Sequence, residues 1–250
     1  MFSFFKKTPK KELPGEVPAD FSFLGCDMHS HLVPGIDDGS KSLEMSVDFI
    51  RSLKDKGYRK LITTPHIHLE FYDNHKEKLE RHFAALKRFV QDQRINIELE
   101  IAAEYFLDNL FLSGVLPDGL LTFGDNYVLV EVSMAGWPRN FNDIIFTIQS
   151  QGYKPVLAHP ERYLYEPDVK IYQQLKDKGV MMQMNMLSIS GYYGKTVKML
   201  AERFLEHKIY DFCGTDLHHE RHHANITKLM KEEPELMAQL AAYNFKNHTL

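Results

Sequence analysis

The feature of this sequence that most constrains its fold is a regular alternation of short apolar runs with longer amphipathic stretches. Seven runs have the length and composition of buried strands, and they span 24–28, 60–64, 95–103, 127–133, 155–159, 180–185 and 209–214. Between these runs, apolar residues recur every three or four positions, as they do from Leu43 to Leu53, which predicts amphipathic helices. Three of these stretches end, just before a strand, in a glycine typical of a helix C-terminus: Gly57, Gly152 and Gly179.

Alternating strands and helices predict a parallel sheet with helices packed outside it. Seven such units in 250 residues, with no long linker between them, predict one α/β domain. We expect a closed (β/α)7 barrel, TIM-like but one unit short of the usual eight. A doubly wound open sheet is the alternative, although no glycine-rich nucleotide-binding motif follows any predicted strand.

The N-terminal segment differs from the rest of the chain. Residues 1–20 combine a short Phe-containing stub, several lysines and helix-breaking prolines. We therefore predict a flexible arm over 1–20 and a single domain over 21–250. A solvated tail is the simplest interpretation of the arm, and a weak contact with a membrane surface or a partner is the alternative.

Charge and composition exclude several classes of function. The chain has 30 Lys and Arg against 34 Asp and Glu, a net charge of −4, and so lacks the basic footprint of a nucleic-acid-binding protein. No apolar run approaches the roughly 18–20 residues that a membrane span needs, and the N-terminus is not ordered like a secretory signal. Cys26 and Cys213 are too few for a disulfide framework, which favours a cytoplasmic location.

Ionisable side chains stand at or near the C-terminal end of six predicted strands, the end at which (β/α) barrels place their active sites. His29 and His31 are two positions apart on an extended segment, so both side chains point to one face. A single such residue is usually a hydrogen-bonded polar group, but six in one register favour a metal site, because unpartnered buried carboxylates are costly. The candidate ligands are His29, His31, Asp38, His66, Glu104, Glu131, His159, Asp216 and His218.

This ligand set predicts the kind of metal and the kind of substrate. Nine ligands are too many for one ion and suit two or three ions that share carboxylates. None of the nine is a cysteine, which favours manganese, iron or zinc over thiophilic ions. Four carboxylates against three divalent ions leave a net charge of about +2. We therefore expect the substrate to be an anionic ester, such as a phosphate ester, that is attacked by a metal-activated water.

An ordered set of motifs carries a family resemblance. The motifs are HSHLVPGIDDG (29–39), TTPH (63–66), AAEYFLD (102–108), LVEVS (129–133), AHPER (158–162) and GTDLH (214–218). Over about residues 24–245 the chain resembles the PHP superfamily of metal-dependent phosphoesterases, and within it the bacterial tyrosine-protein phosphatases of the CpsB/YwqE type. The resemblance implies a distorted seven-stranded barrel, the PHP fold, with three divalent transition-metal ions. Manganese is the first expectation, with iron, cobalt or zinc as alternatives.

The resemblance also implies roles for individual residues. The nine candidate ligands match the family's ligands, with Asp38 rather than Asp37 at the second Asp of the DDG motif. The two phosphate-binding arginines of the family fall on Arg162 and Arg221. Neither cysteine begins the Cys-x5-Arg motif of thiol-based tyrosine phosphatases.

The implied activity is hydrolysis of phosphotyrosine in proteins. By analogy with the family, the substrate is the Tyr-rich tail of a bacterial tyrosine kinase that controls exopolysaccharide or capsule export. Two alternatives stay open: a PHP-type phosphatase for small molecules such as histidinol phosphate, and an inactive metal-binding module. The sequence leaves the oligomeric state undetermined.

Overall fold

The computed structural model of the chain describes residues 17–250, and every ladder between its strands is parallel, as predicted. The strands are β1 (Cys26–Asp27), β2 (Lys60–Thr63), β3 (His66–Ile67), β4 (Glu98–Ile101), β5 (Glu104–Phe106), β6 (Tyr127–Glu131), β7 (Lys154–Ala158), β8 (Met181–Asn185) and β9 (Phe212–Gly214). They form a three-stranded sheet of order β1-β2-β4 and a six-stranded sheet of order β3-β5-β6-β7-β8-β9. The predicted arm, 1–20, falls mostly outside the described residues.

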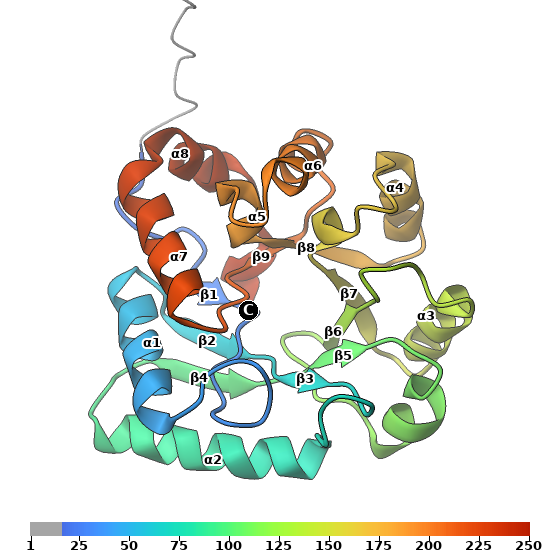
Figure 1. Cartoon of the computed structure of the whole chain (residues 1–250), viewed down its shortest axis with the longest axis horizontal. Coiled ribbons are helices and arrows are strands. Elements are labelled where there is room, and N and C mark those ends of the chain that lie inside the picture. The colour runs from blue at the N-terminus through green and yellow to red at the C-terminus, as the bar shows by residue number, and fades with distance from the viewer. Residues whose placement is uncertain (1–16) are drawn as a thin grey trace, which may run out of the picture.

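Helices surround these strands (Figure 1). They are α1 (Leu43–Asp55), α2 (Lys76–Asp92), α3 (Phe141–Ser150), α4 (Val169–Asp177), α5 (Met186–Ser190), α6 (Lys195–Glu206), α7 (Glu220–Glu232) and α8 (Pro234–Ala242). Short helical turns lie at Phe111–Val115, Leu116–Asp118, Pro160–Arg162 and Lys246–Thr249. Gly57, Gly152 and Gly179 have φ angles of 97°, 86° and 85° and follow the C-caps of α1, α3 and α4, which confirms the predicted helix ends. Within 17–250, none of the helices combines the length and apolarity that crossing a bilayer requires.

Two short strands that the sequence did not predict follow the second and third predicted strands. The run 60–64 contains β2, and the unpredicted β3 begins after Pro65; the run 95–103 contains β4, and the unpredicted β5 begins directly after it at Glu104. Pro65 has no N–H to donate to a ladder, but its carbonyl still accepts from Glu104 N at 3.1 Å. The strands therefore occupy seven positions around a ring, and the second and third positions hold two short strands each.

The first and last strand positions meet at a distorted seam. No ladder joins β1 to β9 among the described strands. Just beyond their C-terminal ends, an isolated parallel bridge between Ser30 and Leu217 connects the two segments. The side chain of Asp27 adds a second link, because its carboxylate accepts from Thr215 N at 2.9 Å and from Thr215 Oγ1 at 2.6 Å. The structure is therefore a distorted, TIM-like (β/α)7 barrel whose closure depends on a few bonds.

Within β1 and β9 themselves, the turn Lys246–Thr249 takes the place of a ladder. Asn247 Nδ2 donates to the carbonyls of Cys26 on β1, at 2.9 Å, and of Cys213 on β9, at 2.6 Å. Its Oδ1 accepts from Cys213 N at 2.9 Å. Figure 1 shows the C-terminus inside the ring of strands, beside β1 and β9.

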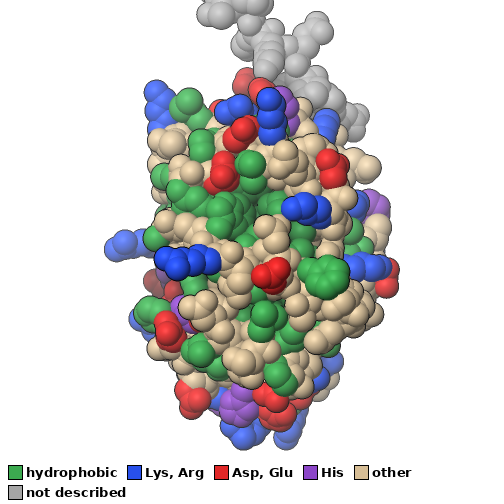
Figure 2. All heavy atoms as spheres, turned by 90° about the vertical axis from the view of Figure 1, so that its right-hand side faces the viewer, with side chains coloured by type: hydrophobic (Ala, Val, Ile, Leu, Met, Phe, Trp, Pro, Cys, Tyr) green, Lys and Arg blue, Asp and Glu red, His purple; other side chains and the backbone are tan. Residues whose placement is uncertain are grey.

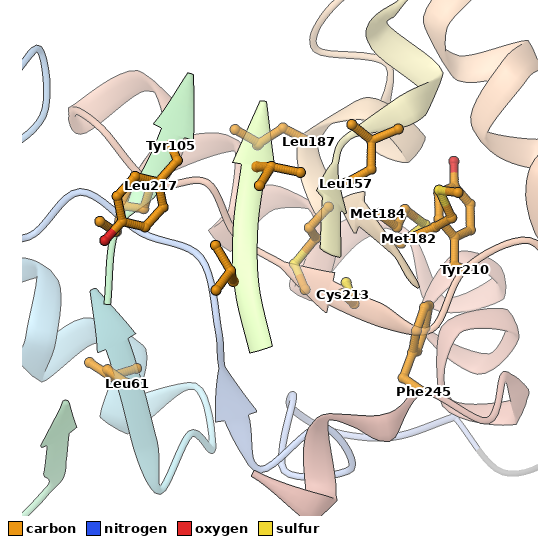
Figure 3. Packing of buried hydrophobic residues seen from close by; sticks show 14 of the residues in the cluster. Leu61, Tyr105, Leu157, Met182, Met184, Leu187, Tyr210, Cys213, Leu217 and Phe245 are labelled. Atoms are coloured by element: carbon orange, nitrogen blue, oxygen red, sulfur yellow. The ribbon is translucent and has the colours of Figure 1, made fainter. Parts of the chain in front are cut away.

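Alternating strand residues divide between two apolar clusters. The smaller cluster fills the ring and contains Ile62, Leu129, Val156 and Phe212, whereas their sequence neighbours belong to the larger cluster, which packs against the helices. Figure 3 shows part of the larger cluster, including Leu61, Leu157, Met182, Met184 and Cys213. The interior of the ring is thus a packed core and not a pore, so polar chemistry is left to the strand ends.

The side of the ring that carries α3 and α4 has a cavity of its own, of about 360 Å³. Figure 2 shows this side, where hydrophobic side chains gather among scattered Lys and Arg. Trp137 lines this cavity and packs on Phe141 with ring centroids 4.6 Å apart.

Candidate metal centre

The structure brings all nine predicted ligands to the C-terminal ends of the strands, where a cavity of about 350 Å³ opens. Seven of the nine line this cavity directly, and His29 and His31 lie fully buried beneath it. The seven are Asp38, His66, Glu104, Glu131, His159, Asp216 and His218. Because the strands are parallel, residues far apart in sequence reach one level of the barrel.

Glu104, at the start of β5, is the centre of this arrangement. Its Oε2 lies 3.1 Å from His29 Nε2, 3.3 Å from His31 Nε2 and 3.4 Å from His66 Nδ1. Its Oε1 lies 3.2 Å from His159 Nε2. One carboxylate therefore faces four imidazoles, a geometry suited to an oxygen ligand shared between cations.

Eight of the nine candidate ligands fall into three overlapping groups, each with its ligand atoms within 4.8 Å of one another. Glu104, His31 and His66 each belong to two groups, so the groups share members. The groups are His31, Asp38, His66 and His218; His29, His31, Glu104 and Asp216; and His66, Glu104 and Glu131. His159 lies next to the third group, with Nε2 3.5 Å from Glu131 Oε1.

The two buried histidines that follow β1 are held by partners outside the cluster. His29 Nδ1 lies 2.9 Å from Gln183 Oε1, and His31 Nδ1 lies 2.9 Å from Asp37 Oδ2. Both acceptors fix the proton on Nδ1 and direct Nε2 toward Glu104. Metal-binding histidines almost always have an outer partner of this kind, which sets their tautomer and orientation.

Asp37 and Asp38 are neighbours with different positions. Asp37 is turned inward, where Oδ2 accepts from His66 N at 3.0 Å as well as contacting His31. Asp38 faces the cavity, with Oδ1 3.6 Å from His66 Nε2 and 3.5 Å from His218 Nε2. Asp37 therefore supports the candidate ligand His31, whereas Asp38 is itself placed as a candidate ligand.

The donor set fits cations because it leaves buried oxygens unsatisfied. Glu104 Oε1 and Asp216 Oδ1 are buried and have no hydrogen-bond partner within residues 17–250, although imidazole nitrogens lie nearby. Burial and the charge of Glu104 raise the pKa of Glu131 well above its usual range. A cation placed between these carboxylates would satisfy the oxygens and remove the repulsion.

Two of the nine side chains are presented from strained backbone. His159 has a φ of 34° and Asp216 a φ of 50°, both in the left-handed region that residues other than glycine rarely adopt. Each follows the end of a strand, β7 and β9 respectively. Strain of this kind persists where the surrounding contacts over-determine the conformation, which is typical of functional sites.

Arg162 contributes a positively charged guanidinium to the lining of the cavity. Its Nη1 donates to Asp216 Oδ2 at 3.3 Å, and its guanidinium lies 4.5 Å from the centre of the Tyr193 ring. Asn185 Nδ2 donates to the same Asp216 oxygen at 2.6 Å. The guanidinium is therefore held between an aromatic face and a carboxylate at the edge of the cluster.

Arg221, the second predicted arginine, is exposed in the first turn of α7 and does not line the cavity. His219 and His222 line it instead. Residues three apart in a helical turn share a face, and Arg221 lies between them on the outer side. Its role as a phosphate ligand stays a prediction.

Comparison with known protein families identifies one to which the sequence matches. The family described as "Capsular polysaccharide synthesis, CpsB/CapC" matches residues 25–235. The chain belongs to the CpsB/CapC family. The resemblance drawn from the motifs is thereby confirmed at the level of the family.

Relatives of this CpsB/CapC chain are named as tyrosine phosphatases. It is 25% identical over 235 residues to "Tyrosine-protein phosphatase YwqE" of Bacillus subtilis, covering 90% of this chain and 92% of the relative. It is 28% identical over 199 residues to "Tyrosine-protein phosphatase CpsB" of Streptococcus pneumoniae, covering 77% and 82%.

Solved structures show the same fold. The crystal structures of YwqE from Bacillus subtilis and CpsB from Streptococcus pneumoniae, described as "unique metal-dependent tyrosine phosphatases", match with a TM-score of 0.72 and 24% identity, covering 89% of this chain and 94% of that chain. A phosphotriesterase homology protein from Escherichia coli matches with a TM-score of 0.53 and 9% identity, covering 89% and 93%.

Sequence reasoning missed two residues of this CpsB/CapC site, Gln183 and Asn185. Both lie on β8, whose predicted strand carries no ionisable side chain, so this strand was not included among the six that carry ligand candidates. The signal was present as two amides spaced two apart at the end of an apolar strand, which places both on one face.

Proposed function

We propose that this chain is a metal-dependent phosphatase that hydrolyses phosphotyrosine in proteins. The observation that carries the proposal is the convergence of imidazole and carboxylate side chains around Glu104, beside Arg162, in one open cavity. The names of the Bacillus and Streptococcus relatives support phosphotyrosine as the substrate.

The nine clustered side chains are the proposed ligands of three divalent ions, with manganese first and iron, cobalt or zinc as alternatives. When bound, such ions supply a Lewis acid for the phosphoryl oxygens and a nucleophilic water at neutral pH. Glu104 would contribute to more than one ion, because it belongs to two of the three overlapping groups. Gln183 and Asp37 keep the Nε2 atoms of His29 and His31 directed toward Glu104.

Arg162 is proposed to bind the phosphate. A guanidinium presents two parallel N–H donors to an oxyanion and holds the phosphate as its charge grows during the reaction. Asn185 and Tyr193 position this group, since Asn185 fixes the Asp216 oxygen that Arg162 contacts and Tyr193 stacks on the guanidinium.

The recessed ligands favour a long side chain. His29, Glu104, His159 and Asp216 have at most 1% of their surface exposed. A tyrosyl phosphate extends further from its backbone than a seryl phosphate and can reach the centre while the peptide stays outside.

The finer assignments are a Tyr-rich tail of a bacterial tyrosine kinase as substrate, a role in exopolysaccharide or capsule regulation, and a cytoplasmic location. Membership of the capsular polysaccharide synthesis family supports the role in exopolysaccharide or capsule regulation. Cys26 and Cys213 are buried free thiols, which is compatible with a reducing compartment.

Metal analysis combined with turnover tests the proposal. We expect about two to three equivalents of transition metal per chain and loss of activity with a chelator. The value of kcat/KM is then compared for a phosphotyrosine peptide, a phosphoserine peptide, histidinol phosphate and single-stranded DNA. Faster turnover of histidinol phosphate or DNA would reject the tyrosine phosphatase assignment, and full activity of metal-free protein would reject the metal centre.

A further inference from the structure

Large apolar side chains that are exposed are distributed unevenly over the surface. Among residues 17–250 there are eight, and five of them lie in segments that leave the C-terminal ends of strands. These five, which we name the apolar rim, are Leu69, Phe71, Leu110, Met134 and Leu164. The other three are Val17, Phe146 and Met199.

The apolar rim follows four consecutive strands of one sheet. Its members come after β3, β5, β6 and β7, which are neighbours in that order. Since these strands are parallel, the segments that leave them lie side by side along one arc of the barrel mouth.

The arc adjoins the candidate metal centre. Met134 lines the same cavity as the ligands. Leu164 is two residues beyond Arg162, and its N–H donates to the carbonyl of Arg162 at 3.0 Å. The rim is thus continuous with the site of the proposed reaction.

Phe71 is supported in its exposed position. With 74% of its surface exposed, it packs on the His68 ring at 4.6 Å, and His68 stacks in turn on Phe106 at 4.0 Å. The His68 Nε2 lies 3.8 Å from Asp108 Oδ2, which ties this segment to the one after β5. Such a stack presents an aromatic ring to solvent without burying it in the core.

Single exposed apolar residues are ordinary, but several on neighbouring segments beside a cavity indicate a binding surface. We propose that the apolar rim binds apolar side chains that flank the phosphotyrosine in a protein substrate, an inference that rests on the proposed function. Glu70 and Asp108 lie within this arc and make it unfavourable for acidic flanking residues. Of the rim residues only Met134 lines the cavity, so a small phosphate ester would meet the rim at that residue alone, and the other four distinguish protein from small-molecule substrates.

Binding of non-hydrolysable peptides tests the rim separately from catalysis. Two peptides carry the same phosphonate analogue of phosphotyrosine, one flanked by Leu and Phe and the other by Ser and Gly. Their affinities for the metal-loaded full chain are measured by fluorescence anisotropy. We expect the apolar peptide to bind about 10-fold more tightly, with Phe71→Ser removing most of this difference.

The matched control is Phe146→Ser on α3, because Phe146 is 71% exposed but lies away from the strand ends. We expect this variant to change neither affinity. Equal binding of the two peptides, or equal weakening of both by Phe71→Ser, overturns the inference. Loss of the preference for the apolar peptide in Phe146→Ser also overturns it.

The proposed function can fail independently. Hydrolysis of the phosphotyrosine forms of both peptides, without any preference in affinity, supports the function and rejects the rim. Rim-dependent binding without turnover supports the rim and rejects the function. Rim-dependent binding to anionic lipid vesicles, in place of the peptide, assigns the surface to a membrane and rejects the inference.

Discussion

The side chain of Asn247 pairs with both backbone groups of Cys213, accepting from its N–H at 2.9 Å and donating to its carbonyl at 2.6 Å. The same amide donates to the carbonyl of Cys26 at 2.9 Å. Asn247 is fully buried, and it joins the first and last strands where the described strands form no ladder. One side chain therefore satisfies three backbone groups that the barrel leaves without partners.

Asn247→Ala is expected to lower the free energy of unfolding by about 2–4 kcal/mol, because it leaves buried backbone groups unsatisfied. Urea denaturation followed by circular dichroism measures this change. The control is Asn225→Ala, since the Asn225 amide donates to the carbonyl of Arg221 at an exposed helix position. We expect less than about 0.5 kcal/mol there. Equal losses in the two variants would contradict the role of Asn247 at the seam.

Gln183→Leu is expected to weaken metal binding about 10- to 100-fold, since it removes the acceptor that orients His29. Competition with a chelator of known affinity measures the change, and thermal unfolding of the metal-free chain checks the fold. Gln173→Leu, at an exposed position of α4, serves as the control. Unchanged metal affinity in Gln183→Leu would show that His29 needs no outer partner.

Arg162→Ala is expected to lower kcat/KM for a phosphotyrosine peptide about 10²- to 10³-fold, by analogy with the loss of one oxyanion donor. Arg162→Lys should restore only part, because an ammonium cannot form the bidentate contact. Arg221→Ala tests the second predicted arginine. From its exposed position we expect a smaller loss, and a loss equal to that of Arg162→Ala would mean that Arg221 reaches the phosphate in the complex.

The two cysteines are expected to be dispensable for turnover. Burial raises the pKa of both thiols, and both are free, so Cys26 and Cys213 should resist iodoacetamide in the folded chain. Mass spectrometry with and without denaturant measures the alkylation. The double variant Cys26→Ser/Cys213→Ser should keep its chemistry apart from lost stability. Inactivation by alkylation of either thiol would point to a thiol mechanism.

Two truncations test the predicted domain boundary. Removing residues 1–16 should leave kcat/KM within a few-fold, since the predicted ligands all lie beyond this segment. Removing residues 1–23 also deletes Phe21, which is fully buried and stacks on Tyr58 at 5.8 Å. We expect that truncation to cost about 3–5 kcal/mol in unfolding free energy, as for loss of a core Phe. Similar stability of the two forms would place the boundary further along the chain.

Periodicity and residue chemistry were sufficient to predict the parallel strands, the helices and the position of the candidate ligands. The strand ends bring His29, Glu104 and Asp216 to one level because parallel strands share a direction, and local sequence contains that information. The predicted run 60–64 ends before Pro65, in agreement with the end of β2, whereas the end of β4 at Ile101 and the short strands β3 and β5 carried no comparable signal.

Contacts that depend on long-range register could not be predicted. Nothing near Asn247 in sequence indicates that its amide bonds to strands 34 and 221 residues away. The orientation of Arg221 likewise depends on where α7 begins, and helix starts are poorly determined by sequence. The resemblance had selected Asp38 over Asp37, but the contact of Asp37 with His31 and that of Asp38 with His218 could be seen only in the structure.

The seam has a consequence for the order of events during synthesis. His29 emerges from the ribosome long before Asp216 and before the Asn247 turn that secures the seam. Until then, His29 lacks Asp216, one of the two carboxylates that contact it in the folded chain. The full set of nine candidate ligands can come together only after β9 has joined the ring, so we expect an ion that needs all of them to bind after this strand has been translated.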